Sequence, residues 1–114
     1  MSSSFPKTPL GMYNDLNRRY FDGELPSNVV FRWAEPHGEV EYIDTREDEA
    51  AVLKADGVWI MYLNAGLKCF PRQLYMTIAH EAIHIRYPDA LHGGSVWKRE
   101  VRRLQGLGLF LRCF

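Results

Sequence analysis

The stretch PRQLYMTIAHEAIHIRYP, residues 71–88, predicts the helix around which the rest of this chain is organised. Pro71 suits the first position of a helix and Pro88 cannot continue one, so the two prolines bound the segment. We expect the helix to run to about Tyr87 and to pack on a core, because its apolar residues recur at helical spacing. That inner stripe consists of Leu74, Ile78, Ala82 and Ile85, with Ala79 and Ile83 alongside.

The residues before this segment predict another helix and two strands. Thr8 suits the cap of a helix that has Pro9 at its first position and ends near Asp22, before a glycine. The segment VVFRW, residues 29–33, is β-branched and aromatic, which favours a strand. The apolar run VWIMYLN, residues 58–64, is short and flanked by turn-forming residues, which is typical of a buried strand.

The acidic stretch between the two strands, residues 35–56, is less regular. Val40 and Tyr42 alternate with acidic residues, so a short edge strand and a loop both remain open there. Residues 47–55 are expected to form a loop or a short helical turn.

The C-terminal part predicts a last helix. Ser95 can cap a helix over residues 96–104 that turns Val101 and Leu104 inward, and the apolar tail after it is expected to dock on the core. The predicted order is helix, strand, uncertain strand, strand, helix, helix. We therefore expect an α+β domain over residues 8–114, with a small sheet on one side and helices on the other, after a flexible tail of residues 1–7.

Composition limits the function classes. A chain of 114 residues with 46% apolar and 13% aromatic residues is typical of one globular domain, and its net charge of zero gives no general attraction to nucleic acid. Cys69 and Cys113 are far apart and form no Cys-x-x-Cys pair. The chain has no apolar leader and no run long enough to span a membrane, so we expect an intracellular protein without a membrane partner.

The predicted central helix carries the sequence His80-Glu81-Ala82-Ile83-His84, an H-E-x-x-H motif. Residues four apart lie one above the other on a helix, so the two imidazoles can bind the same ion. This pattern is typical of zinc sites in which the glutamate acts as general base on a metal-bound water. We expect one Zn²⁺ per chain, held by His80 and His84, with Glu81 as the catalytic residue.

A catalytic zinc needs a third protein ligand, and two candidates follow the motif. His92 lies just past the helix end, and Gly93-Gly94 after it lets the backbone turn tightly. Glu100 lies on the predicted last helix, as in enzymes with a glutamate ligand. The spacing favours His92, and Glu100 remains the alternative.

Four stretches of this sequence together resemble the SprT-like, or Spartan-type, zinc metalloproteases. They are YNDLNRRYFDGELP (13–26), FRWAE (31–35), IMYLNAGL (60–67), and HEAIH followed by His92-Gly93. The resemblance covers about residues 10–104. One departure is Trp97, which stands four positions after Gly93 where the family usually has an aromatic residue after three.

The resemblance implies a minimal zincin-like metalloprotease domain. It also implies a zinc-dependent endopeptidase with protein substrates, in some members proteins crosslinked to DNA. His80, His84 and His92 match the family's ligands and Glu81 its general base. The alternative is an inactive zincin-fold protein that binds a partner or nucleic acid, with zinc in a structural role. An intact Glu81 argues against that alternative, because structural zinc requires no acid there.

Two further groups are candidates for function. Lys98, Arg99, Arg102 and Arg103 form a basic stripe that predicts weak DNA binding, stronger for single strands if Trp97 or Trp59 is exposed. An ordinary solvated helix face explains the same stripe. A tyrosine could stabilise the oxyanion, and the sequence does not choose among Tyr42, Tyr62, Tyr75 and Tyr87.

Overall fold

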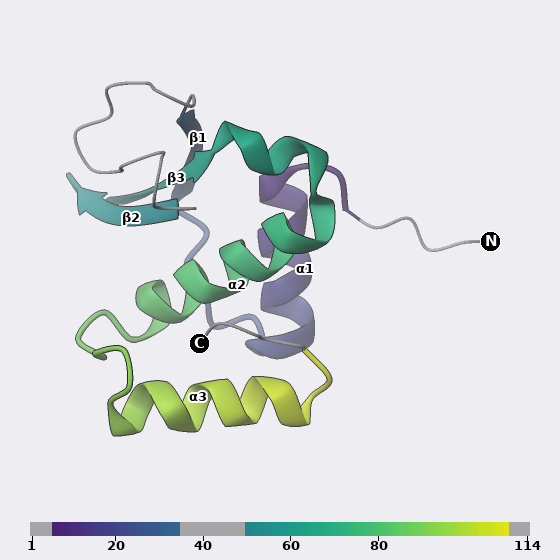
Figure 1. Ribbon diagram of the computed structural model, residues 1–114. Coiled ribbons are helices and arrows are strands. Elements are labelled where there is room, and N and C mark those ends of the chain that lie inside the picture. Colours follow the sequence, from purple (N-terminus) through teal and green to yellow (C-terminus); the bar gives the residue numbers. More distant parts are fainter. Residues whose placement is uncertain (1–5, 35–49, 110–114) are drawn as a thin grey trace.

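The computed structural model describes residues 6–34 and 50–109, which form three α-helices, one short 3-10 helix and three strands (Figure 1). In chain order these are α1 (Pro9–Tyr20), β1 (Val29–Ala34), β2 (Ala50–Ala55), β3 (Val58–Asn64), η1 (Ala65–Cys69), α2 (Pro71–Arg86) and α3 (Ser95–Gly106). The expected α+β class is confirmed. The suggested strand near Val40 and Tyr42 and the N-terminal residues 1–5 lie outside the described residues.

Helix α1 begins as predicted, because the Gly11 N–H donates to the Thr8 hydroxyl at 3.0 Å. After the helix ends, the side chain of Asn17 holds the returning chain. Its Oδ1 accepts from the Leu25 N–H at 2.9 Å and its Nδ2 donates to the Leu25 carbonyl at 3.4 Å. Asn17 thus fixes the direction in which the chain leaves α1 for the sheet.

The sheet has the strand order β1-β3-β2, with β1 parallel and β2 antiparallel to the central β3. Ile60 on β3 pairs with Val30 on one side and Leu53 on the other. The loop or helical turn expected over residues 47–55 is wrong for residues 50–55, which form strand β2.

A two-residue turn explains why residues 50–55 become a strand. Asp56 and Gly57 both have positive φ, 51° and 77°, and Ala55 pairs directly with Val58 across them. An Asp-Gly pair between two runs is a strong signal for a tight β-hairpin, because both central residues must adopt φ > 0. The hairpin therefore outweighs the weak strand propensity of the alanines in β2.

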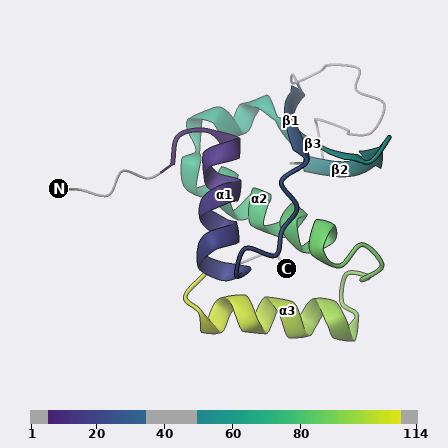
Figure 2. The ribbon, with the colours of Figure 1, turned by 180° about the vertical axis from the view of Figure 1, so that it is seen from behind.

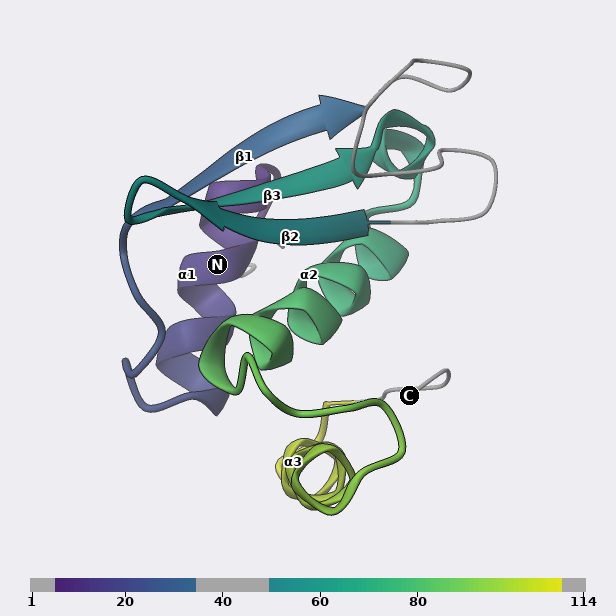
Figure 3. The same cartoon turned by 90° about the vertical axis from the view of Figure 1, so that its left-hand side faces the viewer.

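The helices are layered beneath the sheet. Helices α1 and α2 lie against one face of it, and α3 lies on the far side of α2 from the strands (Figures 1 and 3). The reverse view shows α1 and α2 side by side above α3 (Figure 2). The core between these layers includes Met12, Leu16, Met61, Leu63 and Ile78, each exposed by 1% or less.

Helix α2 is buried on nearly every side. All six apolar residues predicted for its inner stripe are buried, and so are Tyr75, Thr77 and Glu81. From Leu74 to Ile85 only Met76, His80 and His84 are partly exposed. These three lie at helical spacing, so this part of α2 shows solvent a single narrow stripe, which carries the two histidines.

Helix α3 begins one residue earlier than predicted and extends to Gly106, with Gly94 rather than Ser95 at its cap position. Leu104 is fully buried and Val101 packs against the core, as expected. Of the apolar tail, Leu109 is buried and Leu107 is half exposed, whereas residues 110–114 lie outside the described part. Within residues 6–34 and 50–109, no helix has the length and apolar character needed to cross a membrane.

Replacing Asn17 by alanine tests the connection from α1 to the sheet. Asn17→Ala should lower the free energy of unfolding by about 1–2 kcal/mol, because the Leu25 amide loses its partner in a half-buried setting. Asn14→Ala, on the exposed face of the same helix, should change it by less than about 0.5 kcal/mol. Urea unfolding of the two variants compares them directly, and equal stability would contradict this role of Asn17.

Candidate metal centre

Helix α2 supplies two histidines and the connection to α3 supplies a third. His80 and His84 lie on the open stripe of α2. The chain then leaves the helix through a turn in which the Ala90 N–H donates to the Tyr87 carbonyl at 3.0 Å. The backbone turns again at Gly93, directly after His92. Gly93 has φ of 78°, a conformation that favours glycine.

The three imidazoles converge. His92 Nε2 lies 3.2 Å from His80 Nε2 and 3.0 Å from His84 Nε2. The ligand atoms of all three residues lie within 4.8 Å of one another, and no other group of three potential ligands is found among the residues that the structure describes. The turn after α2 therefore brings His92 to the motif, as the sequence predicts.

This cluster fits a tetrahedral zinc ion. Two imidazole nitrogens bound at 2.0–2.1 Å to such an ion are about 3.3 Å apart, close to the two separations observed here. The donor set is three imidazoles without a thiolate or carboxylate, which suits Zn²⁺. His92 is exposed and the other two are partly exposed, so solvent can reach the site from outside. The residues present thus fit a site with three protein ligands and one accessible position.

The electrostatics of the cluster keep its helical imidazoles uncharged. Burial, together with the neighbouring His84 and His92, lowers the pKa of His80 from 6.5 to about 4. Burial and His92 also lower the pKa of His84 below its ordinary value. At neutral pH both rings are therefore neutral, which is the form that binds a metal ion.

Glu81 follows His80 on α2 and lies beside the cluster. It is only 6% exposed, and its Oε2 lies 3.7 Å from Nε2 of His80. A carboxylate is rarely buried to this extent, because desolvation disfavours its charged form. Its place next to the nitrogen that faces the cluster is suited to a base acting on a bound water.

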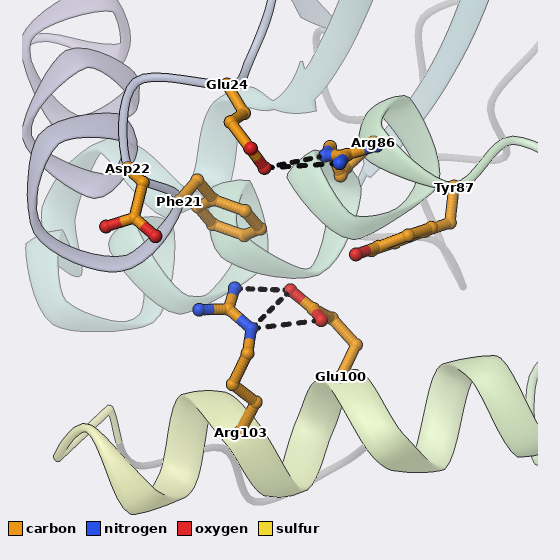
Figure 4. A pocket seen from close by; sticks show the side chains of 7 residues that line it. All are labelled: Phe21, Asp22, Glu24, Arg86, Tyr87, Glu100 and Arg103. Atoms are coloured by element: carbon orange, nitrogen blue, oxygen red, sulfur yellow. Dashed lines mark hydrogen bonds and ion pairs between the residues drawn. The ribbon is translucent and has the colours of Figure 1, made fainter.

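Glu100, the alternative third ligand, is not part of the histidine cluster. It is buried at 2% exposure, and both its oxygens accept hydrogen bonds from Arg103, including two from Nε at 3.1 Å. Glu100 and Arg103 line a separate pocket of about 170 Å³. Figure 4 shows this pair across from the Glu24–Arg86 ion pair. The geometry therefore favours His92 over Glu100.

Trp97 has a place that the sequence reasoning missed. It is 2% exposed and its ring packs against all three histidines, so it is not available to stack on nucleic-acid bases. The spacing signals its burial, because Trp97, Val101 and Leu104 recur at i, i+4 and i+7 on one helix face. Trp59 is partly exposed, with the Lys54 ammonium over its ring at 5.4 Å.

The four residues of the predicted basic stripe separate into two groups. Lys98, Arg99 and Arg102 are exposed on α3. Arg103 turns toward the protein, where it pairs with Glu100 and lies over the Phe21 ring at 5.5 Å. The exposed basic surface of α3 therefore consists of three cations instead of four.

Of the candidate tyrosines, one has a hydrogen-bond partner on α1 and another lines the second pocket. The Tyr75 hydroxyl donates to Asp15 Oδ2 at 2.7 Å and so ties α2 to α1. Tyr87 lines the pocket that holds Glu100 (Figure 4). Tyr62 is partly exposed on β3, and Tyr42 lies outside the described residues.

Comparison with known proteins gave no match: no family model, no curated protein and no solved structure is similar enough to this chain to be reported.

The purified protein should contain about one zinc ion per chain, since three neutral imidazoles converge. His80→Ala and His84→Ala should abolish this binding, and His92→Ala should weaken it strongly. Glu100→Gln should retain the metal while it destabilises the fold, because Arg103 loses a charged partner. Metal analysis with chelator competition measures each variant. Zinc retained in both helix variants, or lost from Glu100→Gln while the protein stays folded, would contradict this ligand set.

Proposed function

We propose that this chain is a zinc-dependent endopeptidase with a zincin-like catalytic domain. The observation that carries the proposal is the convergence of three imidazole nitrogens with a buried carboxylate beside them. His80, His84 and His92 are the metal ligands, and Glu81 is the general base. The sequence resemblance to SprT-like metalloproteases supports the same roles for the same four residues.

The site's own residues account for hydrolysis of a peptide bond. A zinc ion held by the three imidazoles would polarise the carbonyl of the scissile peptide bond and lower the pKa of a bound water. Glu81 accepts the proton of the attacking water and transfers it to the leaving amine. Burial of Glu81 holds its carboxylate in one orientation, so that little reorganisation is needed during the reaction.

We further propose that the substrates are intracellular proteins associated with DNA. The exposed cations Lys98, Arg99 and Arg102 lie on α3, the helix that directly follows His92. Such a surface can neutralise a few phosphates without reading sequence. Arg103 pairs with Glu100 and Trp97 packs against the histidines, so neither side chain is available to DNA. The expected binding is therefore weaker than a stripe of four cations and an exposed indole would give.

The activity proposal is tested by Glu81→Gln. This variant should retain zinc and fold but lose about 10²–10⁴-fold in peptide cleavage, because an amide cannot accept the proton of the water. Glu24→Gln makes the same chemical change on an exposed side chain that lines the other pocket and should leave cleavage unchanged. Cleavage of an unfolded protein substrate provides the assay, and wild-type-like activity of zinc-loaded Glu81→Gln would exclude this base.

The DNA proposal is tested by reversing two charges on α3. Wild-type protein should bind single-stranded DNA weakly, with a slope of log K against log salt of about −2 to −3 for three phosphate contacts. Arg99→Glu with Arg102→Glu should remove the binding without removing zinc. Fluorescence anisotropy at several salt concentrations measures both.

The matched control for charge is Arg32→Glu with Arg72→Glu, two exposed arginines on β1 and α2. If this control removes DNA binding as strongly as the α3 variant, the α3 surface has no specific part in it. If wild-type protein does not bind even at low salt, DNA has no place in the function.

A further inference from the structure

Trp97 is the side chain that joins α3 to the histidine cluster. It lies in the first turn of α3 and is 2% exposed. The centroid of its ring lies 4.9 Å from that of His80, 4.8 Å from that of His84 and 4.6 Å from that of His92. One indole thus contacts all three candidate ligands, from both elements that supply them.

The indole ring and the three imidazole rings are almost evenly spaced. The centroids of the three imidazoles are separated by 5.1, 5.0 and 4.8 Å, so they form an almost equilateral triangle. The indole centroid is about equally far from its three corners and therefore lies over the middle of the triangle, on one side of its plane. That side of the cluster is filled by an apolar ring.

The ligand nitrogens point toward the middle of the same triangle. His92 Nε2 is 3.2 and 3.0 Å from the Nε2 atoms of His80 and His84, much less than the separations of the ring centroids. An ion at 2.0–2.1 Å from each nitrogen must therefore lie near this plane. On the side of Trp97 a further ligand would collide with the indole, whereas the other side has no such obstruction from that ring.

We propose that Trp97 is a positioning residue that closes one side of the metal site. It keeps the three imidazoles convergent through ring contacts, and it leaves the bound ion a single open position on the opposite side. An apolar wall also keeps water from the ligands on the closed side, which favours four-coordinate over higher-coordinate geometry. The inference rests on the metal-binding part of the proposed function and holds whether or not the bound ion cleaves peptides.

The test compares Trp97→Ala with Trp97→Phe, using the full chain. The matched control is Trp59→Ala, which removes a partly buried indole from β3 that packs against the core. Two readouts besides activity are used. Zinc affinity is measured by chelator competition, and the visible absorption bands of the Co²⁺-loaded proteins report coordination number, because four-coordinate Co²⁺ absorbs much more strongly than five- or six-coordinate Co²⁺.

Trp97→Ala should bind zinc about 10–100-fold more weakly, and its Co²⁺ bands should fade as water reaches the opened side. Trp97→Phe should restore strong bands and most of the affinity, because an aromatic ring again covers the triangle. Trp59→Ala should match the wild type in both. Wild-type affinity and spectrum in Trp97→Ala would overturn the proposal, and so would equal losses in Trp59→Ala.

A measurement on the wild-type protein covers the case in which Trp97→Ala does not fold. One equivalent of Co²⁺ should quench tryptophan fluorescence, and most of this quenching should be absent in Trp97→Phe, which keeps Trp33 and Trp59. Equal quenching in the two proteins would overturn the placement of Trp97 against the ion. None of these readouts uses peptide cleavage, so a protein that binds metal through this site but cleaves nothing would refute the proposed activity alone.

Discussion

The burial of α2 on nearly every side is the constraint on which the rest of this structure depends. The sheet covers one face of the helix, and α1 and α3 lie along others (Figures 1 and 3). Between Leu74 and Ile85, only the stripe with Met76, His80 and His84 remains partly open to solvent. Two imidazoles on a helix can converge on one ion only if the helix holds its rotation about its own axis. Packing on the other faces fixes that rotation, so the core residues position the site.

The third histidine and α3 extend this constraint beyond the helix. Pro88 and the turn at Gly93 return the chain so that His92 meets the α2 histidines. Helix α3 is then held by a few large contacts. Trp97 packs on the imidazoles, the Glu100–Arg103 pair lies against Phe21, and Leu104 enters the core. The candidate site and the docking of α3 are therefore parts of the same packing arrangement.

Much of the fold could be predicted from the sequence where local signals agreed. Pro71, Pro88 and the apolar stripe between them specify α2, and Thr8-Pro9 specifies the start of α1. Strand β2 is not evident from the composition of residues 50–55, because alanine and lysine have weak strand propensity, and the Asp56-Gly57 turn pairs it with β3. Tertiary pairing decided that segment, and the tight turn was its only strong local signal.

The candidate site was predictable to the extent that spacing defines it. Four residues of helix place His80 over His84, and a break with glycines after His92 allows the return. Spacing favoured His92 but did not exclude Glu100, because the exclusion depends on Arg103 being near enough to hold the glutamate. The contact of Trp97 with the histidines also depends on how α3 docks, which no local pattern specifies.

X-ray absorption spectroscopy of the zinc-loaded protein tests the three-histidine site directly. We expect three imidazole nitrogens and one further oxygen or nitrogen ligand, all at about 2.0–2.1 Å, in a four-coordinate shell. A shell that contains sulfur, or one with fewer than three imidazoles, would contradict the assignment of His80, His84 and His92 as an open zinc site.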